Sequence, residues 1–396
     1  MSAARGQHRL SWKDWRLVLL FPVLFGLAGC AGPGPDRDFR LAAHRAPDRA
    51  AWVPKVPPVS EFKACGERAP LAAVLRFWGA PARPGSLAEP GADPAVLPDS
   101  EEAMVRAVWR HGLWAYPCSA SDERLKQWLR AGVPVLVRME TDSPREAPPI
   151  DALVVGFDDA RELRLVDRLS GGRAAQPSAD FLRRWRAADH RALVIRPPDD
   201  ARLELGAEER VFRARYFEAA GQTAPAIRDY EAALESGVHS PAMLVSLGNL
   251  YRGQERAGEA EALYRRAIRD DPRQARAYNN LAYLLAEQNR DVEEAVRLAR
   301  QALVLDPANP LFMDTLGYAL MEQKRYDEAA RVLERAWGRS RWYPTHTQLE
   351  IGVRLALAHF RGGQEHLAAE VLRDLLSMDP ALVLPDELQP LASPGR

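Results

Sequence analysis

Cysteine is the residue type in this 396-residue chain with the widest chemistry, because a thiol can attack a carbonyl, ligate a metal, form a disulfide or accept a lipid. Three occur, Cys30, Cys65 and Cys118. None belongs to a C-x-x-C pair, and the eight histidines form neither an H-E-x-x-H motif nor a pair at helical spacing. The sequence therefore predicts no metal site and no cofactor.

The first 30 residues have the composition of an export signal. Four basic residues lie within 1–16, and the apolar run over 17–29 that follows is too short to span a bilayer. A short buried helix that ends in an ordinary cysteine is the alternative. The flanking charge and the small residues before Cys30 favour export.

Leu27-Ala28-Gly29-Cys30 resembles the lipobox of bacterial lipoproteins. The resemblance implies cleavage before Cys30 and attachment of a diacylglycerol to its thiol. Because alanine and not aspartate follows the cysteine, the expected destination is the outer membrane, with the protein facing the periplasm. We therefore predict a signal peptide over 1–30 and a flexible tether over 31–52.

Cys65 and Cys118 lie in a region, 53–198, whose pattern predicts helices followed by strands. Gly79, Gly112 and Gly132 each end a predicted helix. The predicted helices cover about 71–79, 101–111 and 121–130, and the predicted strands cover 133–137, 152–157, 163–166 and 192–195. Helices first and strands afterwards indicate an α+β domain.

This region resembles the bacteriocin-processing, double-glycine-leader cysteine peptidases, which have a papain-like fold. The resemblance rests on Cys65-Gly66 before an apolar helix, on the runs over 132–137 and 152–158, and on Val166-Asp167. It implies that Cys65 holds the nucleophile position and Asp167 the acid position. The family's histidine position falls on Ile150 or Asp151, and its glutamine before the nucleophile is not matched.

A thiol without an imidazole cannot run acyl transfer efficiently, so the resemblance implies a catalytically degenerate domain. Proline is tolerated only in the first turn of a helix, so a helix that begins near Pro70 would leave Cys65 outside it. Two alternatives stay open. His111 or His190 could approach Cys65 and make an active envelope peptidase, or Cys65 and Cys118 could form a disulfide.

From residue 207 the sequence changes to alanine-rich helical periodicity with an internal repeat. Segments around Gly248, Ala282 and Gly317 recur at roughly the 34-residue period of tetratricopeptide repeats, which they resemble. The clearest unit continues with Ala260, Tyr264, Ala267 and Pro272, which match the small, aromatic, small and proline positions of that family. We predict about five units over 207–382 and a tail over 383–396, with an irregular helical bundle as the alternative.

Stacked hairpins of this kind expose the first helix of each unit to an extended peptide or a partner helix. Asn249, Asn280 and Tyr283 lie on first helices and are the candidate peptide-binding residues, although ordinary solvated residues would look the same. The formal net charge of zero excludes the basic excess that polynucleotide partners require. The fold expected is a papain-like α+β domain followed by an all-α solenoid, and the function expected is a membrane-anchored scaffold that binds a protein or peptide.

Overall fold

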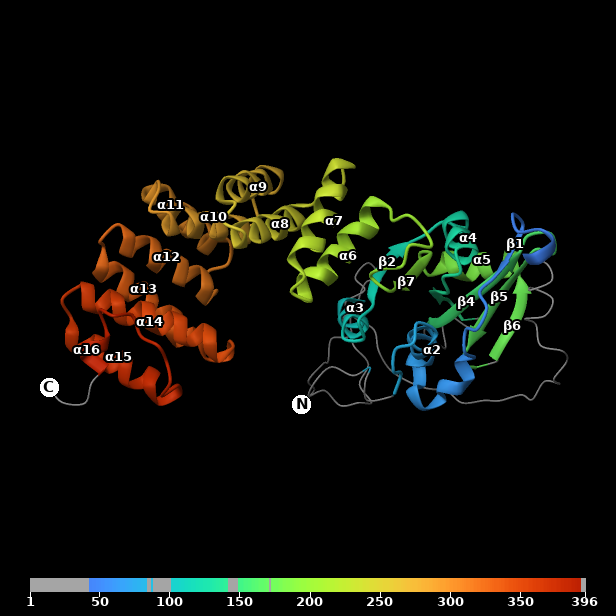
Figure 1. The fold of residues 1–396 in the computed structure, drawn as a ribbon, viewed down its shortest axis with the longest axis horizontal. Helices are drawn as coiled ribbons and strands as arrows, with labels where there is room; N and C mark the ends of the chain where they lie inside the picture. Colours follow the sequence, from blue (N-terminus) through green and yellow to red (C-terminus); the bar gives the residue numbers. More distant parts are fainter. Residues whose placement is uncertain (1–42, 84–86, 88–100, 142–148, 171, 393–396) are drawn as a thin grey trace, which may run out of the picture. The chain divides into compact units, whose positions relative to one another are not determined.

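The structure, a computed structural model, describes residues 43–83, 87, 101–141, 149–170 and 172–392 (Figure 1). The chain divides into two units, residues 1–229 and 230–396. The predicted signal peptide, Cys30 and the tether up to residue 42 lie outside the described residues. Within the described ranges, no helix is both long enough and apolar enough to cross a membrane.

The first unit contains an antiparallel sheet, in which the described residues supply seven strands in the order β2-β7-β3-β4-β5-β6, with β1 beside β4 (Figure 1). Every neighbouring pair is antiparallel. The strands are β1 (Ala50–Trp52), β2 (Trp114–Ser119), β3 (Val135–Met139), β4 (Ile150–Asp158), β5 (Leu163–Arg168), β6 (Gly172–Pro177) and β7 (Arg191–Arg196). The α+β prediction is confirmed.

Among the described residues, one 3-10 segment and four α-helices that lie between strands in the sequence pack against this sheet. They are η1 (Val59–Arg68), α2 (Ala69–Phe77), α3 (Glu101–Trp109), α4 (Asp122–Arg130) and α5 (Ser178–Ala187). The core between helices and strands contains Trp114, Trp128, Trp185, Phe157 and Phe181, each at most 1% exposed. Burial of large aromatic side chains is the main favourable contribution to the free energy of folding of such a unit.

Three strands, β1, β2 and β6, were not predicted, and the first two have a simple physical reason. β1 lies inside the stretch predicted as a flexible tether, because Ala50 and Ala51 are buried and pair with β4. Three residues are too few for alternation to show in the sequence. β2 contains Pro117, a residue that breaks central strands, but β2 pairs only with β7 at the edge of the sheet, where proline is tolerated.

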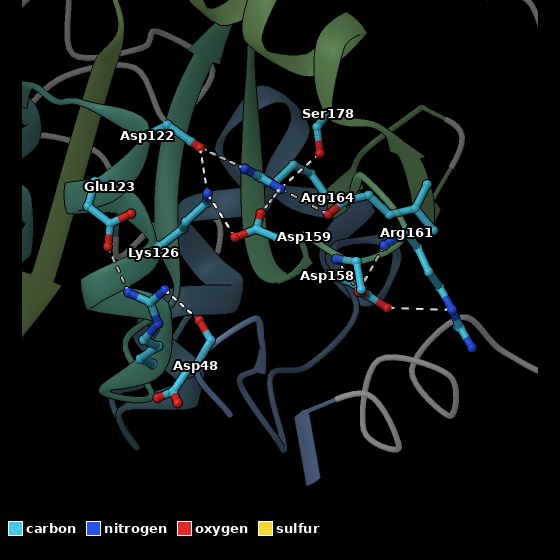
Figure 2. A network of polar contacts seen from close by, with 12 residues as sticks. Asp48, Asp122, Glu123, Lys126, Asp158, Asp159, Arg161, Arg164 and Ser178 are labelled. Carbon is cyan, nitrogen blue, oxygen red and sulfur yellow. Dashed lines mark hydrogen bonds and ion pairs between the residues drawn. The ribbon is translucent and has the colours of Figure 1, made fainter. Parts of the chain in front are cut away.

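A buried arginine joins three elements of this unit (Figure 2). Arg164 on β5 is 2% exposed and donates to both carboxylate oxygens of Asp122 at 2.7 and 2.9 Å, and to Ser178 Oγ at 2.8 Å. Lys126 Nζ lies 3.0 Å from Asp122 and 2.9 Å from Asp159. Asp122 begins α4 and Ser178 begins α5, so the network fixes both helix N-termini against the β4–β5 turn.

The residues from 207 to 378 form five consecutive helical hairpins. Their helices are α6 (Ala207–Ala219), α7 (Thr223–Glu235), α8 (Pro241–Gly253), α9 (Ala257–Asp270), α10 (Ala275–Glu287), α11 (Val292–Leu305), α12 (Pro310–Glu322), α13 (Tyr326–Arg339), α14 (Thr345–Arg361) and α15 (Glu365–Met378). The prediction from the sequence was about five units over 207–382. The short segment η3 (Ser340–Trp342) lies between α13 and α14.

Small residues allow the two helices of a hairpin to approach closely. A Cβ atom on Gly248 of α8 would lie 2.6 Å from a ring carbon of Tyr264 on α9, and one on Gly317 would lie 2.5 Å from Leu333 Cγ. Pro272, at the expected proline position, follows α9, and Pro307 follows α11 in the same way, because proline cannot continue a helix.

The predicted tail over 383–396 is in part a packed element. The short helix α16 (Gln389–Ala392) follows α15 and contacts it. Leu388 is fully buried in a cluster with Leu372 and Leu375, so the tail prediction was wrong for these residues. Their apolar side chains cover the last hairpin as a terminal repeat requires.

Candidate functional site

Cys65 lies on η1, before the first long helix of the α+β region. The helix α2 begins at Ala69, with Pro70 in its first turn, so the expectation that Cys65 would fall outside the helix is confirmed. Gly66 lies at a kink inside η1 with φ of 58°, a value that glycine adopts readily. The thiol is therefore not presented to the unsatisfied N–H groups at the start of α2.

The surroundings of Cys65 disfavour a thiolate. Burial raises the pKa of the Cys65 thiol, and the nearby Arg68 guanidinium opposes this rise only in part. Within the described ranges, which include seven of the eight histidines, no histidine hydrogen-bonds to the sulfur. A cysteine nucleophile requires the opposite, a lowered pKa and an adjacent base.

Asp167, the predicted acid, is fully buried on β5, where a backbone amide and an arginine bind its carboxylate. Its Oδ2 accepts a hydrogen bond from the Val59 backbone N–H at 3.2 Å and from Arg173 Nε at 2.9 Å. Arg173 in turn donates to the Val56 carbonyl at 2.9 Å. The carboxylate therefore ties the segment that enters η1 to the sheet, which is a structural task.

The predicted histidine position is occupied by the first two residues of β4. Asp151 faces Arg138 across the β3–β4 ladder, with 3.9 Å between carboxylate and guanidinium. Burial raises the pKa of the Asp151 carboxyl, Arg138 opposes the rise, and Glu67 adds to it. The interaction with Glu67 indicates that the start of β4 lies near η1.

Both alternative histidines have contacts of their own within the described residues. His190 follows α5 in a left-handed turn with φ of 53°, and its ring packs edge-on against Trp185 at 5.1 Å between centroids. His111 lies in the turn after α3, where its N–H bonds to the Val108 carbonyl. His190 therefore has the ordinary structural role of a packing residue.

Cys118 is a free cysteine, and so is Cys65, so the structure does not contain the disulfide left open by the sequence. Cys118 lies on β2 opposite Ala192 of β7. Burial raises its pKa to about 12, with a further contribution from the Glu209 carboxylate. A thiol with so high a pKa is inert at neutral pH.

Alkylation of the reduced protein with iodoacetamide tests the state of both thiols. We expect Cys65 to react more slowly than free cysteine at about pH 7, with a rate that still rises above about pH 9, because the thiolate is the reacting form and its pKa is raised. Cys118 should react more slowly still. Peptide mass spectrometry measures both rates, and Cys65→Ser controls the assignment. Fast reaction of Cys65 with a plateau below about pH 7 would support an active peptidase.

In the second unit, the candidate residues Asn249 and Asn280 contact each other. Asn280 Nδ2 donates to Asn249 Oδ1 at 2.6 Å, and the same oxygen accepts from the Tyr264 hydroxyl at 2.8 Å. Asn279 donates to Asn280 Oδ1 at 3.2 Å. The two candidates thus form a polar link between α8 and α10, with Asn249 exposed.

The third candidate, Tyr283, belongs to a row of aromatic and arginine side chains on four successive first helices. Arg252 of α8 lies over the Tyr283 ring of α10 at 5.0 Å, and Tyr283 packs against Tyr318 of α12 at 5.5 Å between centroids. Arg354 of α14 lies over Tyr318 at 5.0 Å and pairs with the buried Asp314. We call the six residues Asn249, Arg252, Asn280, Tyr283, Tyr318 and Arg354 the first-helix row.

Three members of this row were missed at the sequence level. Tyr318 follows Gly317 as Tyr283 follows Ala282, so the repeated motif itself carried the signal. Arg252 and Arg354 had no such signal, because their contacts join helices of different units. The row combines donors, acceptors and aromatic rings, which suits it to hold a polypeptide and gives it no group arranged for catalysis.

Family models of repeat proteins match this half of the chain. Residues 213–266 and 245–310 match one model and residues 286–341 match another, both described as tetratricopeptide repeat. The C-terminal region consists of tetratricopeptide repeats. This confirms the prediction made from the spacing of Gly248, Ala282 and Gly317. No curated protein matches the sequence.

Several solved structures are similar to part of the chain. The APC/C hetero-tetramer Cut9-Hcn1 is 18% identical over 47% of this chain and 35% of its own, with a TM-score of 0.40. MamA 41-end from Desulfovibrio magneticus RS-1 is 14% identical over 44% and 96%, with a TM-score of 0.39. A thermophilic tetratricopeptide protein in Thermus thermophilus is 18% identical over 44% and 93%, with a TM-score of 0.37. The match to the first spans about a third of that relative.

Proposed function

We propose that this protein is an envelope-anchored lipoprotein that acts as a protein-binding scaffold. Acyl chains on Cys30 hold it at the outer membrane, facing the periplasm, and the tetratricopeptide repeats bind a protein or peptide partner. The α+β region is a papain-like domain that has lost catalysis. No nucleic acid takes part, because the formal charge is balanced at zero.

The first-helix row is the observation that carries the scaffold proposal. Its rings and guanidinium groups are stacked from α8 to α14, and each cation–π contact contributes about 0.5–1 kcal/mol at an exposed site. A surface held in this way loses little side-chain entropy when a partner binds, which favours affinity. It offers both an exposed amide at Asn249 and half-buried tyrosine rings.

The residues of the α+β domain favour peptide binding over peptide hydrolysis. The acid position is engaged by Arg173, the base position is Asp151, and the Cys65 thiol has a raised pKa. Loss of the base alone usually costs several orders of magnitude in rate. A papain-like cleft without its base can still bind an extended peptide by strand pairing.

Site-specific photocrosslinking in intact cells tests the proposal. With benzoylphenylalanine in place of Tyr283, we expect a discrete crosslinked protein, because the row is the partner-binding surface. The matched control carries the same crosslinker at Glu293, an exposed residue at the start of the second helix α11, and should give no such band.

The membrane anchor is measured in the same cells. Labelled palmitate should enter the protein with Cys30 and not the Cys30→Ser variant, and that variant should leave the membrane fraction. Equal crosslinking at positions 283 and 293 would contradict the scaffold, whereas unchanged labelling of Cys30→Ser would contradict only the anchor.

A further inference from the structure

An apolar hollow in the repeat region shares no lining residue with the first-helix row. It has a volume of about 350 Å³ and lies among α11, α12 and α13. Its apolar lining consists of Leu303, Val304, Pro307, Met313, Leu316 and Val332. Pockets that bind small ligands span roughly 300–1,000 Å³, so this hollow has room for one large side chain rather than a whole helix.

Val304 is the residue that most needs an explanation. Its side chain is 72% exposed, although it lines the hollow. The same place in the other second helices, two residues after Ala267, Ala336 and Leu375, holds Arg269, Gly338 and Ser377. The repeat fold therefore does not require an apolar residue there, and an exposed valine beside an apolar hollow points to contact with a partner.

The rim of the hollow is basic. Arg300 on α11 and Arg335 on α13 both line it, and none of the described lining residues is acidic. Arg300 lies 3.9 Å from Glu328, but Glu328 is engaged more closely by Arg325, at 2.7 Å. Arg335 is exposed and forms no ion pair with any residue that the structure describes. The two guanidinium groups are thus available to carboxylates of an incoming segment.

We propose that the α11–α13 hollow binds a polypeptide segment that presents a large apolar side chain flanked by acidic residues. The apolar side chain fills the space beside Val304, and the flanking carboxylates pair with Arg300 and Arg335. This goes beyond the proposed function, which assigns binding to the first-helix row. The site makes the repeat region able to hold two segments at once.

A second copy of the chain is the main competing occupant, and its chemistry fits less well. Trp342 is 85% exposed, but Arg339 and Arg341 flank it, and like charges would oppose the basic rim. Val383 is 89% exposed and precedes the acidic pair Asp386 and Glu387, of which Glu387 is already paired with Arg361. Self-docking through Val383 is therefore an outcome that the test must detect.

Fluorescence anisotropy with three labelled octapeptides tests the proposal on the full chain without its signal peptide. The first probe is Asp-Glu-Ser-Leu-Phe-Ser-Glu-Asp, the second has lysine for every acid, and the third has serine for leucine and phenylalanine. We expect the first to bind about tenfold more tightly than either of the others, because only it satisfies both the apolar floor and the basic rim.

Variants at exposed positions locate the binding. Val304→Arg introduces the side chain found at the equivalent place in α9 and should weaken the first peptide about tenfold, while Val383→Arg is the matched control and should leave it unchanged. Arg335→Glu should weaken the acidic peptide and strengthen the lysine peptide, a reversal that mere loss of folding cannot produce. Arg331→Glu, one turn earlier on α13, is its control.

Equal affinity of the three peptides, absence of saturable binding up to about 1 mM, or no effect of Val304→Arg would overturn the proposal. Sedimentation equilibrium identifies the competing occupant. Self-association that both Val304→Arg and Val383→Arg abolish would assign the hollow to a second copy and overturn the acidic segment. Crosslinking at position 283 should not change in any of these variants, which separates this site from the first-helix row.

Discussion

Glu209→Ala is expected to lower the melting temperature of the first unit by about 6–12 °C. Glu209 lies on α6, the first repeat helix, and is 2% exposed. Its Oε1 accepts from Arg124 Nη2 at 2.9 Å and from Trp128 Nε1 at 3.1 Å, and its Oε2 accepts from the Gly206 N–H at 2.8 Å. Removal of one partner of a buried pair costs about 3 kcal/mol or more, and about 2–4 °C accompanies each kcal/mol in a unit of this size.

Differential scanning calorimetry measures this effect, and two variants control it. Glu208→Ala removes an exposed carboxylate whose recorded bond is to the Tyr116 hydroxyl, so it should cost no more than about 1 kcal/mol. Glu209→Gln keeps an oxygen acceptor and should recover part of the loss. If the Glu209→Ala and Glu208→Ala variants had the same melting temperature, the Glu209 carboxylate would not be what holds α6 to α4.

The expected effect has a functional consequence inside the first unit. The carboxylate of Glu209 bonds to two residues of α4 and to the backbone at the start of α6, so a repeat helix and the α+β fold share one polar centre. Phe212 of α6 also packs edge-on against Tyr116 of β2 at 5.3 Å. Within the first unit, the helix α6 is therefore held to the α+β fold by both a shared carboxylate and an aromatic contact.

Repeat architecture could be predicted from the sequence because its signals are local and recur. Gly248, Ala282 and Gly317 occupy one position of successive units, and each is small because a second helix passes close by. The prolines after α9 and α11 mark the ends of helices in the same way. Because each unit has the same local pattern, a weak motif in one unit can be recognised from the clearer motif in the next.

The α+β unit was harder to predict because its decisive contacts are remote in sequence. Glu209 meets Trp128 across 81 residues and Arg164 meets Asp122 across 42. Strands β1 and β2 gave no alternating pattern, since β1 has three residues and β2 contains a proline. Charged residues such as Arg164 and Arg196 would be expected at the surface. They are buried because each pairs with a carboxylate, Asp122 and Asp200 respectively.

The candidate catalytic site was predictable in part for a related reason. The absence of a histidine near Ile150 is visible in the sequence, and so is Pro70 in the first turn of its helix. The partner of Asp167 could not be predicted from the sequence. Arg173 lies on β6, and its run Gly172-Arg173-Ala174-Ala175 lacks the hydrophobic alternation that identifies a strand. Once the β5–β6 register is known, Asp167 and Arg173 face each other directly.

Gly352→Ala is expected to destabilise the second unit by about 2 kcal/mol, although alanine is normally the better helix former by up to about 1 kcal/mol. A Cβ atom on Gly352 would lie 2.5 Å from Leu375 Cδ2 of α15 and 2.6 Å from Trp337 Cζ3 of α13. Both neighbours would have to shift, since side-chain carbons do not approach a Cβ so closely.

Gly338→Ala is the matched control for this prediction. Gly338 lies in α13, is exposed, and has open space where the Cβ atom would be. Only the higher helix propensity of alanine therefore affects its stability, and the Gly338→Ala variant should be slightly more stable. Urea unfolding of the full chain, followed by far-UV circular dichroism, compares the two. Because one methyl group is added to a helical glycine in both variants, opposite signs would show that close approach, and not helix propensity, selects glycine at position 352. Equal signs would mean that α14 can move away from α13 and α15 at little cost, and that the last repeat is packed more loosely than its contacts imply.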